Sequence, residues 1–191
     1  MATDYPALDK KLRTFITRQH VFFTATAAEG TRINISPRST EWLRVIDDNA
    51  AVYLDKTGSG METAAHTLHD GRITLMLCAF DKPPMILRLY GQGRAIFRGT
   101  DEYAALLAEH FGNAEPIGAR QMIRIDIDLV KTSCGYGVPF FDYTGERDTL
   151  DRWAEAKGTE GIVEYRALKN VVSMDGLSTG YEPQEATEPA E

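Results

Sequence analysis

Residues 53–66 read Tyr-Leu-Asp-Lys-Thr-Gly-Ser-Gly-Met-Glu-Thr-Ala-Ala-His, and no other stretch says more about the fold of this chain. A strand-like run over 51–54 stops at the glycine-rich segment 56–60, and a helical pattern follows. Such a junction places two hydroxyls, one ammonium and free backbone N–H groups at the positive end of a helix, where a phosphate can bind. The same residues can also form a simple helix cap, with Ser59 as the N-cap and Glu62 completing a capping box.

Outside this stretch, the composition is that of an ordinary globular domain. The chain has 191 residues, of which 43% are hydrophobic and 26% are charged, enough for one domain with a substantial core. Its formal net charge is −7, but residues 174–191 contribute −5 of this, so the remainder carries only −2. A near-neutral body argues against sequence-independent nucleic-acid binding, which needs a basic face.

The sequence also carries signals about its compartment. No apolar run approaches the roughly 18 residues of a membrane span, and the N-terminus lacks a charged-then-apolar signal pattern. The two cysteines, Cys78 and Cys134, lie far apart in the sequence. These features predict a protein of the reducing cytoplasm, without a disulfide framework and without a membrane partner.

Apolar periodicity divides the chain into helices and strands. It predicts helices over 7–19, 60–69, 101–111, 147–156 and 160–170. It predicts strands over 21–27, 32–36, 51–55, 72–80, 85–98 and 121–129, of which the first two form a hairpin. Because neither a βαβ rhythm nor a Gly-x-Gly-x-x-Gly motif occurs, the pattern favours a mainly β fold with peripheral helices, an antiparallel barrel, over a Rossmann sheet.

Two segments have unusual composition. The strand 72–80 is apolar on both faces, so we expect it to be buried on both sides, against a helix or a second subunit. Residues 173–191 are acidic and nearly devoid of apolar side chains, so we expect them to form a disordered tail. The folded domain is therefore expected to span residues 1–172.

Four short strings, taken in order, point to a known family. They are Asn-Ile-Ser-Pro-Arg at 34–38, the loop and helix start at 54–66, Leu-Arg-Leu-Tyr-Gly at 87–91, and Thr-Ser-Cys-Gly-Tyr-Gly-Val-Pro at 132–139. With the order of elements, they make residues 7–172 resemble the FMN-binding split barrel of the pyridoxamine 5'-phosphate oxidase family. The last string is similar to one oxidase-like branch of that family.

This resemblance implies an antiparallel split β-barrel homodimer with two FMN molecules seated between the subunits. The loop 56–59 would then hold the flavin phosphate, with an arginine of the strand 85–98 nearby. Polar side chains of the string 34–38 would approach the isoalloxazine ring. The cofactor-binding residues that we expect on this basis are Lys56, Thr57, Ser59, Arg88, Asn34, Ser36 and Arg38.

Each of these side chains also has a plainer interpretation. Arg88 belongs to a polar strand face that could simply meet solvent. Arg38 follows Pro37 at a strand end, where it could reach a phosphate or lie on the surface. Asn34 and Ser36 alternate on one face of the hairpin, which could be solvated.

Two other groups of reactive side chains receive structural interpretations. Cys134 lies in a glycine-rich turn, and no histidine follows it in the chain, so we expect it to be structural. Glu62, His66 and His69 have a spacing that suits metal ligands, but no further histidine or cysteine lies near them. We therefore expect no metal there, and we expect His66 to pack under the loop.

The resemblance does not extend to the substrate. The family's oxidase grips pyridoxal phosphate with a C-terminal Arg-x-His element, and residues 121–191 contain no such triplet. We expect a flavin-dependent oxidoreductase whose substrate and catalytic residues the sequence does not identify. The alternatives are a barrel that binds deazaflavin F420 or haem, and a flavin-binding protein without turnover.

Overall fold

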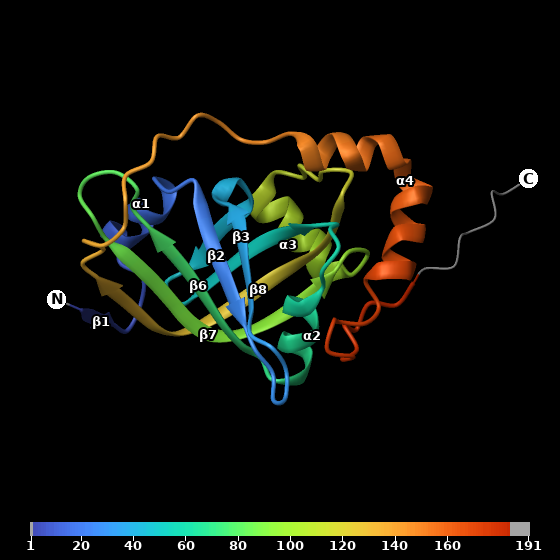
Figure 1. The fold of residues 1–191 in the computed structure, drawn as a ribbon, viewed down its shortest axis with the longest axis horizontal. Coiled ribbons are helices and arrows are strands. Elements are labelled where there is room, and N and C mark those ends of the chain that lie inside the picture. The colour runs from blue at the N-terminus through green and yellow to red at the C-terminus, as the bar shows by residue number, and fades with distance from the viewer. Residues whose placement is uncertain (1, 184–191) are drawn as a thin grey trace, which may run out of the picture.

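The computed structural model describes residues 2–183, which form a curled antiparallel sheet with four α-helices around it (Figure 1). The strands are β1 (Thr3–Tyr5), β2 (Val21–Thr26), β3 (Asn34–Ser39), β4 (Leu43–Asp47), β5 (Ala50–Lys56), β6 (Arg72–Cys78), β7 (Ile86–Phe97) and β8 (Ala119–Ser133). The helices are α1 (Lys10–Thr17), α2 (Glu62–His69), α3 (Asp101–Phe111) and α4 (Thr149–Lys169), with a 3-10 turn, η1 (Thr40–Trp42). The predicted mainly β split barrel is confirmed.

The sheet follows the order β3-β2-β6-β7-β8-β5-β4, and β1 pairs with β8. Every one of these pairings is antiparallel, as the absence of a βαβ rhythm indicated. The strand β7 lies in the middle of the sheet, between β6 along one edge and β8 along the other. A register shift at Tyr90/Gly91 bends it, and a Cβ on Gly91 would lie only 2.0 Å from the Asp126 carbonyl oxygen.

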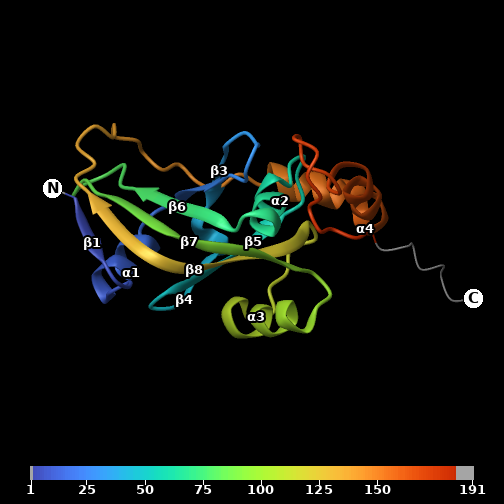
Figure 2. The same ribbon diagram turned by 90° about the horizontal axis from the view of Figure 1, so that it is seen from below.

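Two apolar clusters hold the sheet in shape. The larger one fills the barrel and is built from alternate side chains of the strands together with α1; it includes Leu12, Phe22, Tyr53, Leu75, Leu89 and Ile123. The smaller one lies beneath α3 and includes Leu54, Ile96, Tyr103 and Met122. Figure 2 shows the result, with α3 on one side of the sheet, away from α2 and α4.

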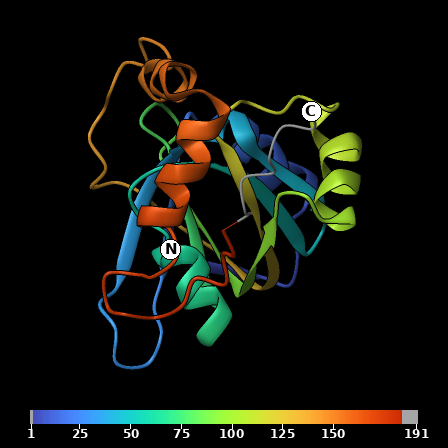
Figure 3. The ribbon, with the colours of Figure 1, turned by 90° about the vertical axis from the view of Figure 1, so that its right-hand side faces the viewer.

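Two helices were predicted near the end of the body, and the structure joins them into the single bent element α4 (Figure 3). The bend lies at Gly158, whose backbone angles are φ 67° and ψ 177°. Glycine alone adopts this combination of angles readily. The two predicted helical segments are therefore confirmed as the two arms of α4. None of the helices in the described part of the chain is long and apolar enough to cross a membrane.

A long segment leads from β8 to α4, and we call residues 134–148 the strap. It crosses the top of the molecule as Figure 1 shows it, and most of its side chains are exposed. It begins at a turn in which Gly135 has a φ of +69° and lies against the backbone of Met85. Cys134 is exposed at this turn, as a free thiol.

Three expectations need correction. Ser59 is not a helix cap: α2 begins after Met61 without a side-chain cap, and the Glu62 carboxylate accepts a hydrogen bond from the Met174 N–H at 3.3 Å. The short strands β1 and β4 were missed, since a strand of three residues and an irregular one with a bulge leave little periodicity. Residues 173–183 of the expected tail pack on the body, with Thr179 buried; residues 184–191 lie outside the described residues.

The strand β6 is fully covered on one face only. Its Ile73, Leu75 and Leu77 are buried inside the barrel, whereas Thr74 and Met76 on the other face are half-buried in the single chain. The strand pairing continues this outer face in two cross-strand rows, which we call the outer rows. They are Ile35-Ala25-Thr74-Tyr90-Leu129 and Pro37-Phe23-Met76-Arg88-Lys131.

Candidate functional site

A cavity of about 400 Å³ lies where β3, β5 and the start of α2 meet, and we call it the loop pocket. It is lined by five of the seven predicted cofactor-binding residues, namely Asn34, Ser36, Arg38, Lys56 and Ser59. They come together because β3 contacts the end of β5 and the start of α2, through Arg38 with Asp55 and through Asn34 with Thr63. These five side chains include two cations and two hydroxyls, a donor set that suits an anion.

The floor of the loop pocket contains a buried ionic cluster. The Asp55 carboxylate is fully buried and accepts hydrogen bonds from Arg38, from Arg120 Nε at 2.9 Å and from Gln121 Nε2 at 2.8 Å. Burial alone would raise the pKa of Asp55, but the Arg120 and Arg38 guanidinium groups hold it below its usual range. Two guanidinium groups on one carboxylate leave the cluster with a net positive charge that faces the pocket.

Arg120 also ties the loop to the body. Its Nη1 donates to the Gly58 carbonyl at 3.2 Å and to Asn170 Oδ1 at 2.9 Å, and its Nη2 donates to the Gly60 carbonyl at 2.7 Å. The Gly58 and Gly60 carbonyl groups of the loop therefore accept hydrogen bonds from within the protein. This arrangement fixes the loop before any ligand binds, which is the preorganisation that a tight site needs.

The rim of the pocket carries the groups that a ligand can reach. Lys56 Nζ is paired with Asp151 of α4 at 2.7 Å and lies 5.3 Å from the centre of the Trp42 ring. Ser59 is exposed, and its hydroxyl has no partner within residues 2–183. The first turn of α2 has no side-chain cap, so its N–H groups are available as well.

A polar chain runs from β3 to the buried His66. Asn34 Nδ2 donates to Thr26 Oγ1 at 3.1 Å and to Thr63 Oγ1 at 3.2 Å, and the Ser36 hydroxyl donates to Asn34 Oδ1 at 3.3 Å. Thr26 Oγ1 also bonds His66 Nδ1 at 3.0 Å. Both N–H groups of Asn34 are therefore engaged within the protein, whereas the Asn34 amide oxygen and the Ser36 hydroxyl oxygen keep acceptor capacity for a ligand.

Two predicted residues lie elsewhere. Thr57 is buried and is not part of the pocket lining; its hydroxyl donates to the Gly118 carbonyl at 2.8 Å and accepts from Arg166 Nε at 2.8 Å. Arg88 belongs to the outer rows and donates to Ser133 Oγ at 3.2 Å. Within one chain, neither side chain reaches the loop pocket, so their predicted roles in cofactor binding remain untested.

Sequence reasoning missed the buried partners of the pocket. Asp55 is the one carboxylate in the buried strand β5, and a buried charge requires a partner, so its position carried a signal. Arg120 and Gln121 stand at the start of β8, 65 and 66 residues along the chain from Asp55. No local pattern identifies them, because only the pairing of β5 with β8 brings them to that carboxylate.

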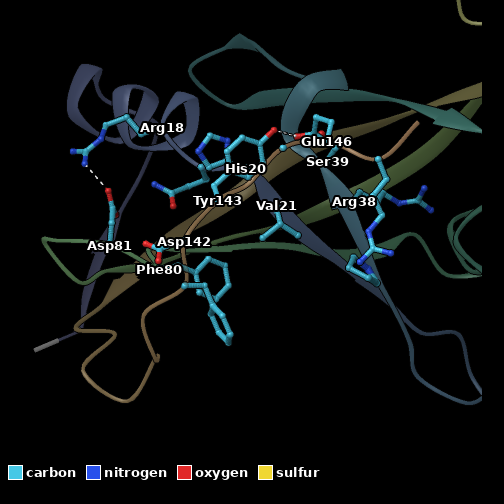
Figure 4. Close-up of a pocket in the computed structure, with 15 residues that line it drawn as sticks. Arg18, His20, Val21, Arg38, Ser39, Phe80, Asp81, Asp142, Tyr143 and Glu146 are labelled. Atoms are coloured by element: carbon cyan, nitrogen blue, oxygen red, sulfur yellow. Dashed lines mark hydrogen bonds and ion pairs between the residues drawn. The ribbon is translucent and has the colours of Figure 1, made fainter. Parts of the chain in front are cut away.

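A second hollow adjoins the loop pocket and shares Pro37 and Arg38 with it. We call it the aromatic hollow; it has a volume of about 700 Å³ and lies between the end of α1, β3 and the strap. Figure 4 shows Tyr143 of the strap beside His20, and their rings stack with centroids 3.6 Å apart. Phe80 and Phe141 form a second aromatic pair in its wall.

Comparison with known proteins gives concordant results. A family model described as pyridoxamine 5'-phosphate oxidase matches residues 8–134. The pyridoxamine 5'-phosphate oxidase family protein ustO of Aspergillus flavus is 35% identical over 189 residues, which cover 91% of this chain and 76% of that protein.

Solved structures agree on the fold. A variant of HupZ from Group A Streptococcus superposes with a TM-score of 0.53 at 18% identity, over 65% of this chain and 98% of the HupZ chain. A protein of Lactobacillus delbrueckii described as a putative pyridoxamine 5'-phosphate oxidase has a TM-score of 0.52 at 16% identity, over 66% of this chain and 94% of its own. At such identities these likenesses establish the split-barrel fold alone.

Proposed function

Because this chain belongs to the pyridoxamine 5'-phosphate oxidase family, we propose that it is an FMN-dependent oxidoreductase. The observation that carries the proposal is the loop pocket, where a preorganised, net positive cluster meets the uncapped start of α2. This donor set fits a phosphate monoester, which is the charged end of FMN. The proposal does not depend on the C-terminal Arg-x-His element with which the family's oxidase binds pyridoxal phosphate, since residues 121–191 contain no such triplet.

Different residues of the loop pocket would bind different parts of a flavin. Ser59, Lys56 and the N–H groups at the start of α2 would bind the phosphate, with Arg38 close behind. Ser36 would offer a hydroxyl to the ring edge, in a position fixed by Asn34. Bound flavin supplies hydride transfer, and the protein's share is to orient it and to shield one face from water.

We propose that the protein works as a homodimer joined through the outer rows. Seven of their ten residues are apolar or aromatic, and Ile35 is 64% exposed in the single chain. Exposed apolar surface of this extent on a regular sheet face supports a partner subunit. Arg88 lies in the same rows, so in a dimer it would face the second subunit and could serve the partner's site.

The aromatic hollow is the best candidate for the substrate site. It opens beside the loop pocket at Pro37 and Arg38, so a molecule in it would lie next to a flavin anchored by the loop. Its two ring pairs, one stacked and one edge-to-face, suit a planar or apolar substrate.

The first test concerns the flavin. We expect the purified protein to be yellow, with the absorption of oxidised flavin. A Soret band would instead indicate haem, and F420 fluorescence would indicate the deazaflavin. The double variant Lys56→Met, Ser59→Ala should bind FMN about 100- to 10,000-fold more weakly, since it removes two charge-assisted hydrogen bonds that contribute about 1.5–3 kcal/mol each. The control is Lys157→Met, at an exposed lysine that lies outside the loop pocket.

The second test concerns turnover. Rapid mixing of the loaded protein with NADH, NADPH or pyridoxamine 5'-phosphate follows the bleaching of the flavin absorption. Reduction by any of them supports the oxidoreductase. If the flavin stays oxidised with all three while binding depends on Lys56 and Ser59, the non-enzymatic flavin-binding alternative is favoured.

A further inference from the structure

A third cavity, of about 740 Å³, lies between the end of β7, α3, α4 and residues 180–183, and we call it the arginine pocket. It shares Arg120 with the loop pocket and no lining residue with the aromatic hollow, and Figure 3 shows α3 and α4 on either side of the strand ends there. Its walls are largely apolar. Its polar lining contains three guanidinium groups, those of Arg98, Arg120 and Arg166.

Arg166 is a buried cation without a carboxylate. It is 6% exposed, and its hydrogen bonds go to neutral oxygens: Nε to the Thr57 hydroxyl at 2.8 Å, and Nη2 to the carbonyls of Ala119 at 2.7 Å and Gly118 at 3.3 Å. No ion pair reaches it from any residue between 2 and 183. A buried charge ordinarily has an ionic partner, because burial without one is costly.

The surroundings of Arg166 add to its positive potential. Burial lowers the pKa of Arg166; the Tyr181 phenol opposes this, and the guanidinium groups of Arg98 and Arg120 lower it further. Two of the acids nearby are already engaged, and a third, Glu182, lines the cavity. Glu115 holds Arg98 through two hydrogen bonds, at 3.0 and 2.8 Å, and the carboxylate that pairs with Arg120 lies in the loop pocket.

Tyr103 places a second donor in the same cavity. It is 3% exposed, and its buried hydroxyl lies near the Glu115 carboxylate without a hydrogen bond of good geometry to any of residues 2–183. Burial, and after it the Glu115 carboxylate, raises the pKa of Tyr103, so the phenol stays protonated and able to donate at neutral pH.

We propose that the arginine pocket binds a small organic anion, with its carboxylate or phosphate on Arg166 and Tyr103. The body of the ligand would rest on the apolar wall that Phe97, Leu107, Val163 and Tyr181 provide. An apolar enclosure with a few convergent polar groups is the usual construction of a small-molecule site. This inference is separate from the flavin proposal, since the two sites use different ligand-facing residues.

The test is calorimetric titration of the full-length, flavin-loaded protein with benzoate, and with benzamide as its neutral counterpart. Phenyl phosphate and inorganic phosphate are the further probes, which separate a carboxylate site from a phosphate site and an organic anion from a bare one. We expect benzoate or phenyl phosphate to bind at least tenfold more tightly than benzamide. If neither benzoate nor phenyl phosphate binds more tightly than benzamide, or if neither organic anion binds at all, the proposal is overturned.

Variants locate the binding. Tyr103→Phe should weaken it several-fold, and Arg166→Met should abolish it. Arg166→Met also removes the hydrogen bond to Thr57, so a loss of binding in that variant has two explanations. The decisive variant is therefore Glu182→Gln, which removes a negative charge from the lining and should strengthen binding about two- to fivefold. Lys157→Met, at an exposed lysine outside both pockets, is the matched control and should leave the affinity unchanged, whereas Lys56→Met tests whether the anion binds in the loop pocket instead.

Two results of these variants would contradict the proposal. If Lys56→Met weakens binding as much as Tyr103→Phe does, the anion occupies the loop pocket instead. If benzoate binds only after Glu185, Glu188 and Glu191 are all replaced by glutamine, the occupant is the chain's own carboxylates. Because all titrations can be repeated on flavin-free protein, a failure of the flavin proposal would leave this inference separately testable.

Discussion

The loop pocket and the aromatic hollow meet at Pro37 and Arg38, yet they are built in opposite ways. The loop pocket rests on a fully buried carboxylate, Asp55, whose partners come from β3 and β8. The aromatic hollow is closed by the strap, where Tyr143 is 49% exposed and is held by a ring stack and one surface hydrogen bond.

This difference suits the two regions to different ligands. A site whose polar groups are fixed by buried partners loses little entropy on binding, so it suits a cofactor that stays in place. A site bounded by an exposed segment can adjust or open, as a substrate that enters and leaves requires. The three predictions below test whether the two regions differ as much as their construction implies.

The largest expected effect is that of Asp55→Asn. It keeps the shape of the side chain but leaves Arg38 and Arg120 without their carboxylate. Breaking a buried ion pair on one side typically costs about 3–5 kcal/mol, so we expect a loss of that size in the free energy of unfolding, measured by chemical denaturation.

The matched control is Asp151→Asn, which removes the partner of Lys56 at the rim. The Asp151 side chain is 40% exposed, so its loss should cost less than about 1 kcal/mol. If the two variants lose equal stability, the loop pocket does not rest on a buried charge, and the contrast with the hollow fails.

A smaller effect is expected in the pH dependence. The pKa of Asp55 is depressed in the folded protein, so its contribution to stability is complete above the unfolded pKa of about 3.9 and is lost as the pH falls through the lower, folded value. The stability gap between the wild type and Asp55→Asn should therefore narrow as the pH falls from about 5 to about 3. A constant gap would mean that the folded and unfolded pKa values of Asp55 are the same.

The same contrast explains what the sequence could predict. Strands, helices and the loop at 56–60 leave local patterns, whereas the seven candidate residues were expected from the family resemblance, and five of them line one pocket. Two partners of Asp55, Arg120 and Gln121, come from a strand more than 60 residues away, so their role depends on sheet order, which apolar periodicity does not specify. Thr57 shows the same limit, since a hydroxyl in a glycine-rich loop can point outward to a ligand or inward to Arg166.

The aromatic hollow was not predicted at all. Its wall combines the end of α1, β3 and the strap, and the aromatic residues of the strap follow no periodicity that distinguishes a site from a linker. The stacking of Tyr143 on His20 and the Phe80–Phe141 pair reveal that the segment returns to the body.

The smallest effect on stability, and the most specific, is expected for Tyr143→Ala. An aromatic pair contributes about 0.5–1.5 kcal/mol beyond its buried area, and this one is half exposed, so the free energy of unfolding should fall by less than about 1 kcal/mol. FMN affinity should not change, because Tyr143 does not line the loop pocket. With any substrate that reduces the flavin, the KM should rise while the rate of flavin reduction at saturation changes less.

Tyr136→Ala is the control for this variant, since Tyr136 lies in the same strap, is 83% exposed and does not line the hollow. It should alter neither FMN affinity nor KM. If Tyr143→Ala weakens FMN binding as strongly as the Lys56, Ser59 double variant does, the flavin extends into the hollow, and the two regions form a single cofactor site. If both tyrosine variants raise KM equally, the strap acts as a whole, and the ring stack on His20 is not what positions the substrate.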